Sequence, residues 1–285
     1  MLSPAELNLL SRLDLAYRRP VSGLYAGERR SPRAARSPEF ADFRPYVSGD
    51  DFRQIDWRAF ARMEKLMLRL YVAEEESSLN IVMDTSASMA LGSPPKWEAA
   101  RRLAAALAFL GLAGMDRVAV GVLGSRTKRT PHLRGKDGVA RIWAFLDSLD
   151  PSGSSSPSQL TELDWPRPGM TVVISDFLTE GAWAAPVAGL RRRRQEPLLW
   201  QILAPDEETP SFSGDFKLVD SESGDSREVT VTPGLVAEYL GALADHRGKV
   251  RRAAEGAGGR FVNSLSGETL ESQMVSGMGA GVVRR

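Results

Sequence analysis

In the stretch "LNIVMDTSASMA", residues 79–90, an apolar run ends in an aspartate, and two serines follow at every second position. A short apolar run of this kind is typical of a strand buried on both faces of a sheet. Asp84, Ser86 and Ser88 then follow the strand with their side chains on one side of the chain. The pattern admits three interpretations: a polar helix cap, a nucleophile loop, or three ligands of a metal site.

Apolar segments of strand length alternate with helical segments from residue 79 to residue 265. The predicted strands are 79–84, 116–124, 170–177, 196–205 and 260–265; the predicted helices are 95–113, 135–149, 181–194 and 232–259, with a hairpin at 216–231. This alternation predicts an α/β fold, with a mostly parallel sheet flanked by helices. Ligands of such sheets lie at the carboxyl ends of the strands. Asp84 and Asp176 both end apolar strands, so we expect them to face one crevice if the strands are neighbours.

The chain is predicted to divide into three parts. Residues 1–75 form a small N-terminal unit, with a helix at 1–18, a basic loop at 19–40 and a charged, aromatic segment from 43 onward. The α/β domain spans 76–265 and carries a hairpin insertion at 210–231. Residues 266–285 form a C-terminal tail with a frayed helix.

Composition excludes several classes of function. The chain has 285 residues, is 42% apolar and carries a formal net charge of +1, so there is no electrostatic case for nucleic acid. It has no cysteine and only two histidines, which leaves little material for thiolate sites, histidine-rich metal sites or a Ser-His-Asp triad. No apolar run is long enough to span a bilayer, so we expect a cytoplasmic protein without membrane insertion.

The nucleophile interpretation of residues 84–88 has the least support. An aspartyl nucleophile needs a second acid two residues on, where Ser86 stands, and no G-x-S-x-G elbow surrounds either serine. The polar cap stays open, because serine and aspartate commonly cap a helix that follows a strand. The metal interpretation is favoured, since oxygen ligands suit Mg²⁺ or Mn²⁺ and a second strand-end aspartate, Asp176, lies downstream.

Two segments carry a family resemblance. "DTSASM" (84–89) resembles the metal-ion-dependent adhesion site of von Willebrand factor A-like domains. "EFADFRPYVSGDDFRQIDWRAFARMEKLMLRLYVAEEE" (39–76) resembles the signature of the bacterial family catalogued as domain of unknown function fifty-eight, with its Arg-x-Tyr-x-x-Gly-Asp-Asp-x-Arg-x-Ile-Asp-Trp pattern. The resemblance implies a Rossmann-like (von Willebrand factor A-like) domain with Mg²⁺ or Mn²⁺ at the carboxyl edge of its sheet.

The second metal loop departs from the family pattern. The expected Gly-Gly-Thr-Asp-Leu stands here as "SGSSSPSQL" (152–160), without a threonine, and we align Ser155 with the missing hydroxyl. The following segment is short and contains prolines, so we expect a reduced helix. The ligand set that the resemblance implies is Asp84, Ser86, Ser88, Ser155 and Asp176, with an acidic side chain of a partner completing the shell.

The resemblance also implies partners. Members of the family are typically encoded beside AAA+ ATPases of the MoxR class, and the two are thought to act as a chaperone-like or assembly system. The expected function is therefore a non-enzymatic, metal-dependent protein-interaction module; a metal-dependent hydrolase and a metal-free scaffold are the alternatives. The signature residues either form an internal network or bind a partner, and the partner-binding candidates are Arg44, Asp50, Asp51, Arg53, Asp56 and Trp57.

Overall fold

The computed structural model describes residues 2–16, 24–26, 40–72, 78–179, 181–221 and 224–284. Contacts divide the chain into two units: Met1–Tyr17 with Ser77–Arg285, here called the α/β unit, and Arg18–Glu76, here called the small unit. This division differs from the predicted boundary at residue 75, because the N-terminal helix belongs to the α/β unit. Among the described residues, no helix is long and apolar enough to cross a membrane.

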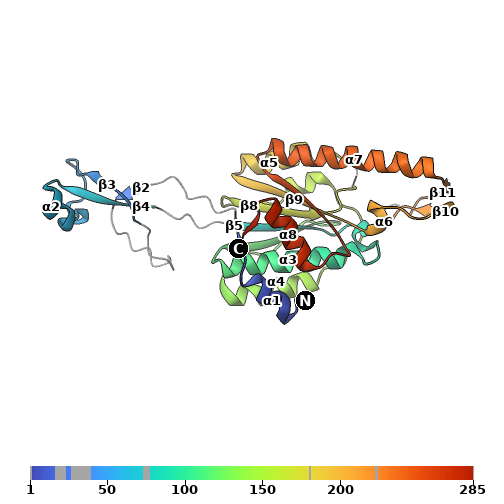
Figure 1. Ribbon diagram of the computed structural model, residues 1–285, viewed down its shortest axis with the longest axis horizontal. Coiled ribbons are helices and arrows are strands. Elements are labelled where there is room, and N and C mark those ends of the chain that lie inside the picture. The colour runs from blue at the N-terminus through green and yellow to red at the C-terminus, as the bar shows by residue number, and fades with distance from the viewer. Residues whose placement is uncertain are drawn as a thin grey trace. The chain divides into compact units, whose positions relative to one another are not determined.

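A six-stranded sheet with the order β12-β9-β8-β5-β6-β7 forms the centre of the α/β unit (Figure 1). All neighbouring pairs are parallel except β6–β7, which confirms the predicted α/β class with a mostly parallel sheet. Every residue of β5 is buried, as its apolar run predicts. The strands are β5 (Ser78–Asp84), β6 (Arg117–Leu123), β7 (Lys128–Arg129), β8 (Gly169–Ser175), β9 (Gln195–Leu203) and β12 (Arg260–Leu265).

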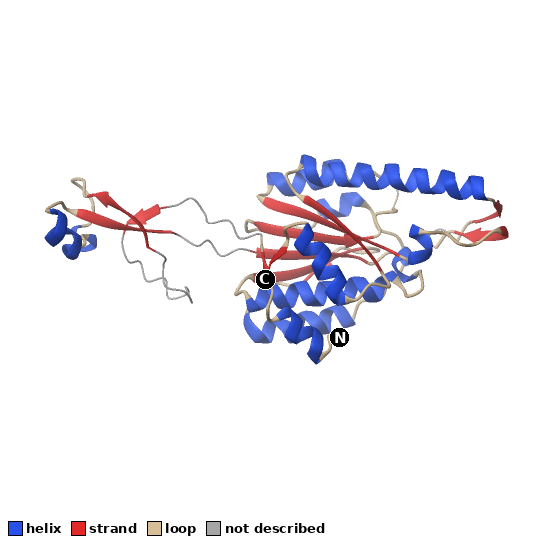
Figure 2. Cartoon of the chain, in the orientation of Figure 1, coloured by secondary structure: helices blue, strands red, loops and turns tan. Residues whose placement is uncertain are grey.

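Helices cover both faces of this sheet (Figure 2). Leu79, Ile81 and Met83 contribute to one core, and Val82 contributes to the other, because successive side chains of a strand point to opposite faces. The first core packs α1 (Pro4–Leu10), α3 (Lys96–Ala113), α4 (Gly135–Asp147) and α8 (Leu270–Gly279); the second packs α5 (Ala184–Arg192) and α7 (Pro233–Gly256).

The two ends of the chain correct two predictions. The predicted frayed tail is an ordered part of the α/β unit, because α8 buries Leu270 and Met274 against the core. After α8, β13 (Val283–Arg284) pairs antiparallel with β1 (Asp14–Leu15). The predicted helix at 1–18 is shorter than expected, since α1 ends at Leu10 and the chain then turns into β1.

The predicted hairpin is present as β10 (Gly214–Val219) and β11 (Ser226–Val231), which pair antiparallel. It follows α6 (Pro205–Glu208), a short helix directly after the carboxyl end of β9. This position brings α6 to the edge of the sheet where the strand-end aspartates lie.

The small unit is a three-stranded antiparallel sheet with two short helices. Its strand order is β2 (Leu24–Ala26), β4 (Met67–Val72), β3 (Phe40–Pro45), and the helices are η1 (Phe52–Gln54) and α2 (Trp57–Met63). Ile55, Ala59 and Leu68 are its buried apolar residues among those described. Most of the predicted basic loop at 19–40 lies outside the described residues.

Candidate metal centre

Three loops meet at the carboxyl edge of the sheet, following β5, α4 and β8. The backbone N–H of Ala87 donates to the carbonyl of Gly153 at 2.8 Å, and that of Ser152 donates to the carbonyl of Thr85 at 2.7 Å. These two bonds join the first loop to the second. Gly153 has a φ of +70°, and a Cβ there would lie 2.4 Å from Ser125 Oγ, so this close approach requires glycine.

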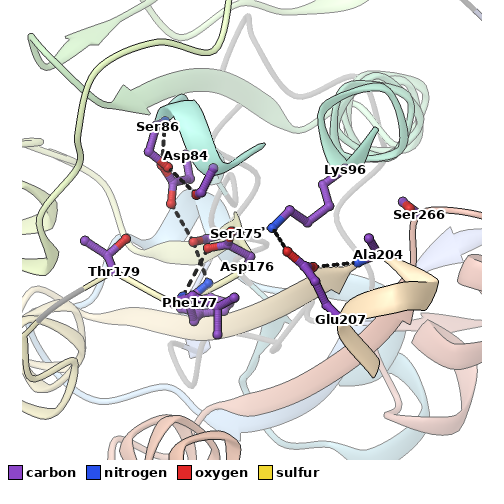
Figure 3. A network of polar contacts seen from close by, with 12 residues as sticks. Asp84, Ser86, Lys96, Ser175, Asp176, Phe177, Thr179, Ala204, Glu207 and Ser266 are labelled. Carbon is purple, nitrogen blue, oxygen red and sulfur yellow. Dashed lines mark hydrogen bonds and ion pairs between the residues drawn. The ribbon is translucent and has the colours of Figure 1, made fainter. Parts of the chain in front are cut away.

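Asp84 is the buried end of β5 in this arrangement. Its Oδ1 accepts a hydrogen bond from the Ser86 backbone N–H at 2.9 Å, and its Oδ2 accepts one from Ser175 Oγ at 2.6 Å (Figure 3). β5 and β8 are neighbours, and their register places Ser175 beside Asp84 and Asp176 one residue further along at the same edge of the sheet, as predicted. Burial raises the pKa of Asp84, and the Asp176 carboxylate raises it further. A bound cation would relieve this repulsion.

Ser86 and Ser88 present two hydroxyls beside Asp84. Ser86 stands at the N-cap of the short helix η2 (Ala87–Ala90), but its side chain makes no capping hydrogen bond. Its Oγ lies 3.1 Å from Ser88 Oγ instead. The next helix, α3, has Pro95 at its N-cap. The structure therefore does not use these serines as the polar cap that the sequence left open, and both hydroxyls point to one place.

The second loop carries Ser155, the serine that we aligned with the missing hydroxyl. Ser155 is buried, and its Oγ lies 3.3 Å from Thr179 Oγ1 in the third loop. Thr179 is absent from the predicted ligand set, although a hydroxyl three residues after Asp176 was the available signal. The reduced helix after this loop is confirmed, because only the 3₁₀ turn η3 (Pro157–Thr161) forms there.

Lys96 is the unexpected member of the centre. Its side chain is fully buried at the start of α3, and its Nζ donates to Asp176 Oδ2 at 2.8 Å and to Glu207 Oε1 of α6 (Figure 3). Glu207 is held by the Ala204 backbone N–H, which donates to its other oxygen at 2.8 Å. Burial acts to lower the pKa of Lys96, but Asp176 and Glu207 outweigh it and the pKa is raised.

Both oxygens of the Asp176 carboxylate are thus engaged within the chain. Oδ2 accepts from Lys96, and Oδ1 accepts from the Leu178 backbone N–H at 3.1 Å. Gln201 Nε2 fixes the backbone here by donating to the Asp176 carbonyl at 2.8 Å. Each carboxylate oxygen can accept more than one bond, so these contacts do not exclude Asp176 from a metal site, but they hold its charge beside Lys96.

The donor set fits a hard divalent cation. Lys96 pairs with Asp176 and Glu207, which leaves Asp84 as the carboxylate beside the serine hydroxyls. The neutral oxygen donors are the hydroxyls of Ser86, Ser88, Ser155 and Thr179. Mg²⁺ and Mn²⁺ prefer such oxygen ligands. Within the described part of the chain, no group of three or more His, Asp or Glu side chains is arranged to hold a metal ion, so a cation at this edge would depend on Asp84 and the hydroxyls.

The signature residues of the small unit mainly contact one another. Arg44 donates to both oxygens of Asp50 at 2.7 Å each, and its guanidinium lowers the pKa of Asp50 to about 2. Asp56 caps α2 through the backbone N–H groups of Arg58 and Ala59 and pairs with Arg69. The remaining candidates are Asp51, which accepts from the Arg53 backbone N–H at 3.0 Å, and the exposed Arg53 and Trp57.

Comparisons with known proteins give a family and a set of relatives. The profile of the family described as "Protein of unknown function DUF58" matches residues 42–249. Uncharacterized proteins of Mycobacterium bovis and Mycobacterium tuberculosis are each 30% identical over 259 residues, covering 87% of this chain and 81% of theirs.

Similar solved structures include the conserved hypothetical protein BatB from Bacteroides thetaiotaomicron, at 15% identity and a TM-score of 0.45, covering 70% of this chain and 95% of that chain. Proximal thread matrix protein 1 from the mussel byssus, whose structure has a zinc-occupied MIDAS motif, is 16% identical with a TM-score of 0.37, covering 45% and 36%.

Proposed function

This chain belongs to the DUF58 family, and we propose that it is a non-enzymatic protein-interaction module whose metal centre binds an acidic side chain of a partner. One observation carries the proposal: Ser86 and Ser88 hold their hydroxyls 3.1 Å apart beside the buried Asp84 carboxylate, and the Ser86 side chain makes no capping hydrogen bond. Hydroxyl ligands are neutral, so they leave most of the charge of a divalent cation uncompensated. Such a cation attracts a further carboxylate from outside.

The residues of the centre have separable roles in this proposal. Asp84, Ser86 and Ser88 would hold Mg²⁺ or Mn²⁺, and Ser155 would add a hydroxyl from the second loop. The metal supplies a positive charge that receives the partner's carboxylate. Asp176, held by Lys96, contributes its charge indirectly. Ser175 keeps Asp84 oriented by donating to its Oδ2.

The rim of the centre suits a protein partner. Leu91, just after the first loop, and Leu178, in the third, are both exposed large apolar side chains. Exposed apolar side chains around a polar anchor are typical of protein interfaces. We propose a MoxR-type AAA+ ATPase, or a client of it, as the source of the acidic side chain, with the pair working in chaperone-like assembly or maturation; the support for this identity is the family resemblance.

A metal-free scaffold is the second candidate, and Lys96 is the observation that favours it. Its ammonium already compensates the charges of Asp176 and Glu207 without any metal. In a scaffold of this kind, Asp84 would be a buried structural carboxylate held by Ser175 and the Ser86 backbone. Partner binding would then be independent of divalent cations.

The test is a pull-down from lysate of the source organism with the full chain, with Mg²⁺ and with EDTA. With Mg²⁺, the wild-type chain is expected to retain a partner that it loses in EDTA, and Ser86→Ala with Ser88→Ala is expected to lack that partner in both conditions. Ser226→Ala, in the exposed strand β11, is the matched control and should behave as wild type. If EDTA and the double substitution leave the whole set of retained partners unchanged, the scaffold is favoured.

A further inference from the structure

The small unit exposes large aromatic side chains on its two short helices. Phe52 is 64% exposed, Trp57 61% and Phe60 39%. The rings of Trp57 and Phe60 lie 6.1 Å apart, edge to face, so they form one apolar feature on α2. A concentration of exposed aromatic side chains in a short segment marks a binding surface more often than a solvated one.

Three arginines accompany these rings. Arg53, Arg58 and Arg62 are exposed, and none forms an ion pair with another described residue. Arg53 lies with its guanidinium carbon 5.9 Å from the centre of the Phe52 ring. Arg58 and Arg62 are one helical turn apart, so they share a flank of α2.

The acidic residues of the same segment do not offset this charge. Residues 51–65 carry four cationic side chains and three carboxylates, Asp51, Asp56 and Glu64. One of the three, Asp56, is buried and committed to Arg69 and to capping α2. The nearby Asp50 is likewise committed, to both guanidinium nitrogens of Arg44. The segment therefore presents a net positive field together with its aromatic side chains.

We propose that Phe52, Arg53, Trp57, Arg58, Phe60 and Arg62, here called the aromatic–arginine surface, bind an acidic partner protein whose apolar side chains pack on Trp57 and Phe60. Tryptophan and arginine are the residues most enriched among those that dominate interface energies. The three arginines select an acidic partner, because a symmetric contact with a second copy would oppose like charges.

This surface is distinct from the metal centre, and the inference goes beyond the proposed function. It also changes the assignment of the signature residues. Of the predicted partner-binding residues, Arg53 and Trp57 belong to the aromatic–arginine surface, whereas Arg44, Asp50 and Asp56 hold the small unit together. No metal ion takes part, so binding at this surface is independent of EDTA.

The test uses the full chain in EDTA and a fluorescent short peptide that alternates glutamate with leucine. Binding is followed by anisotropy and by tryptophan emission, in which Trp57 dominates the response to binding because the other five tryptophans are buried or half-buried. Arg58→Glu with Arg62→Glu is expected to weaken binding about 30-fold, as for an interface hot spot. Lys249→Glu with Arg252→Glu, two exposed cations on α7, is the matched control and should leave affinity unchanged.

Phe60→Ser is expected to weaken binding while leaving the charge intact. Four results would overturn the proposal: equal affinity for a lysine–leucine peptide, no loss on charge reversal, binding only to phosphatidylserine vesicles, or a dimer that charge reversal dissociates. Resistance of Trp57 to acrylamide quenching in the free chain would also overturn it, since another part of the chain would then cover the surface. EDTA removes any bound metal ion, so binding measured in EDTA tests this surface alone. The proposed metal centre can therefore fail its own test without affecting this result, and the reverse also holds.

Discussion

Replacing Lys96 by methionine tests how much the buried ion pairs of the metal centre stabilise the fold. The substitution keeps an unbranched side chain of similar length but removes the ammonium that pairs with Asp176 and Glu207. Removing one partner from a buried ion pair costs about 3–5 kcal/mol, because the remaining charge is left without compensation. Lys96 and Asp176 are both fully buried, so we expect a loss within this range rather than the small effect of a surface pair.

The loss is measured by urea denaturation followed by circular dichroism. A destabilisation of this size corresponds to a fall in Tm of roughly 6–20 °C for a domain of this length. Lys128→Met, which removes an exposed lysine in β7, is the control and should change stability little. If a divalent cation can replace the lost charge, Mg²⁺ should raise the Tm of Lys96→Met more than that of the wild type.

Equal stability of Lys96→Met and Lys128→Met in EDTA would refute a stabilising role for the buried ion pairs of Lys96. That result would mean that Asp176 and Glu207 are not charged together in the folded chain. Glu207→Gln gives a second measurement should Lys96→Met fail to fold, because it removes only one of the three charges. A milder loss than for Lys96→Met is expected, since Glu207 is partly exposed.

Two further predictions concern residues outside the ion pair. Burial, reinforced by Arg129, Arg117 and Arg167, lowers the pKa of His132 to about 4, below its usual 6.5, so the unfolded chain binds more protons between these values. The free energy of unfolding should therefore fall by about 1–2 kcal/mol, discounted for partial exposure, as the pH drops through this window. In a series of urea midpoints against pH, His132→Gln should flatten this fall. An unchanged profile would contradict the assignment to His132. Gly153→Ala should lower the free energy of unfolding by about 1–3 kcal/mol, measured by urea denaturation. Gly135 is the control, because it has a similar φ but open space where a Cβ would lie, so Gly135→Ala should cost less. Equal losses would show that the contact with Ser125 contributes nothing.

The sequence predicts the central strands well, because strands buried on both faces of a sheet are continuous apolar runs. The all-buried run of β5, and the strands that neighbour it, follow directly from apolar composition. The family match over residues 42–249 confirms the resemblance predicted from the signature segment. The C-terminal helix α8 was underestimated, since its glycines weaken helical propensity and only the packing of Leu270 and Met274 fixes it.

The site was predicted where it depends on strand ends and missed where it depends on tertiary contacts. Asp84 and Asp176 follow from the rule that parallel strands end at one edge. Lys96 and Glu207 lie 111 residues apart in sequence, and each reads as an ordinary solvated charge in the first turn of a helix. Their pairing depends on where α3 and α6 lie over the edge of the sheet, which local patterns do not specify.

Whether the serine hydroxyls hold a metal ion is tested most directly by calorimetry. Mg²⁺ and Mn²⁺ are titrated at millimolar concentration into the full chain, into Ser86→Ala with Ser88→Ala, and into the Ser226→Ala control. The proposed function predicts saturable binding to wild type and control and its loss in the double variant. Binding that survives the double variant, or no binding to the wild type, would contradict a metal centre built on these hydroxyls.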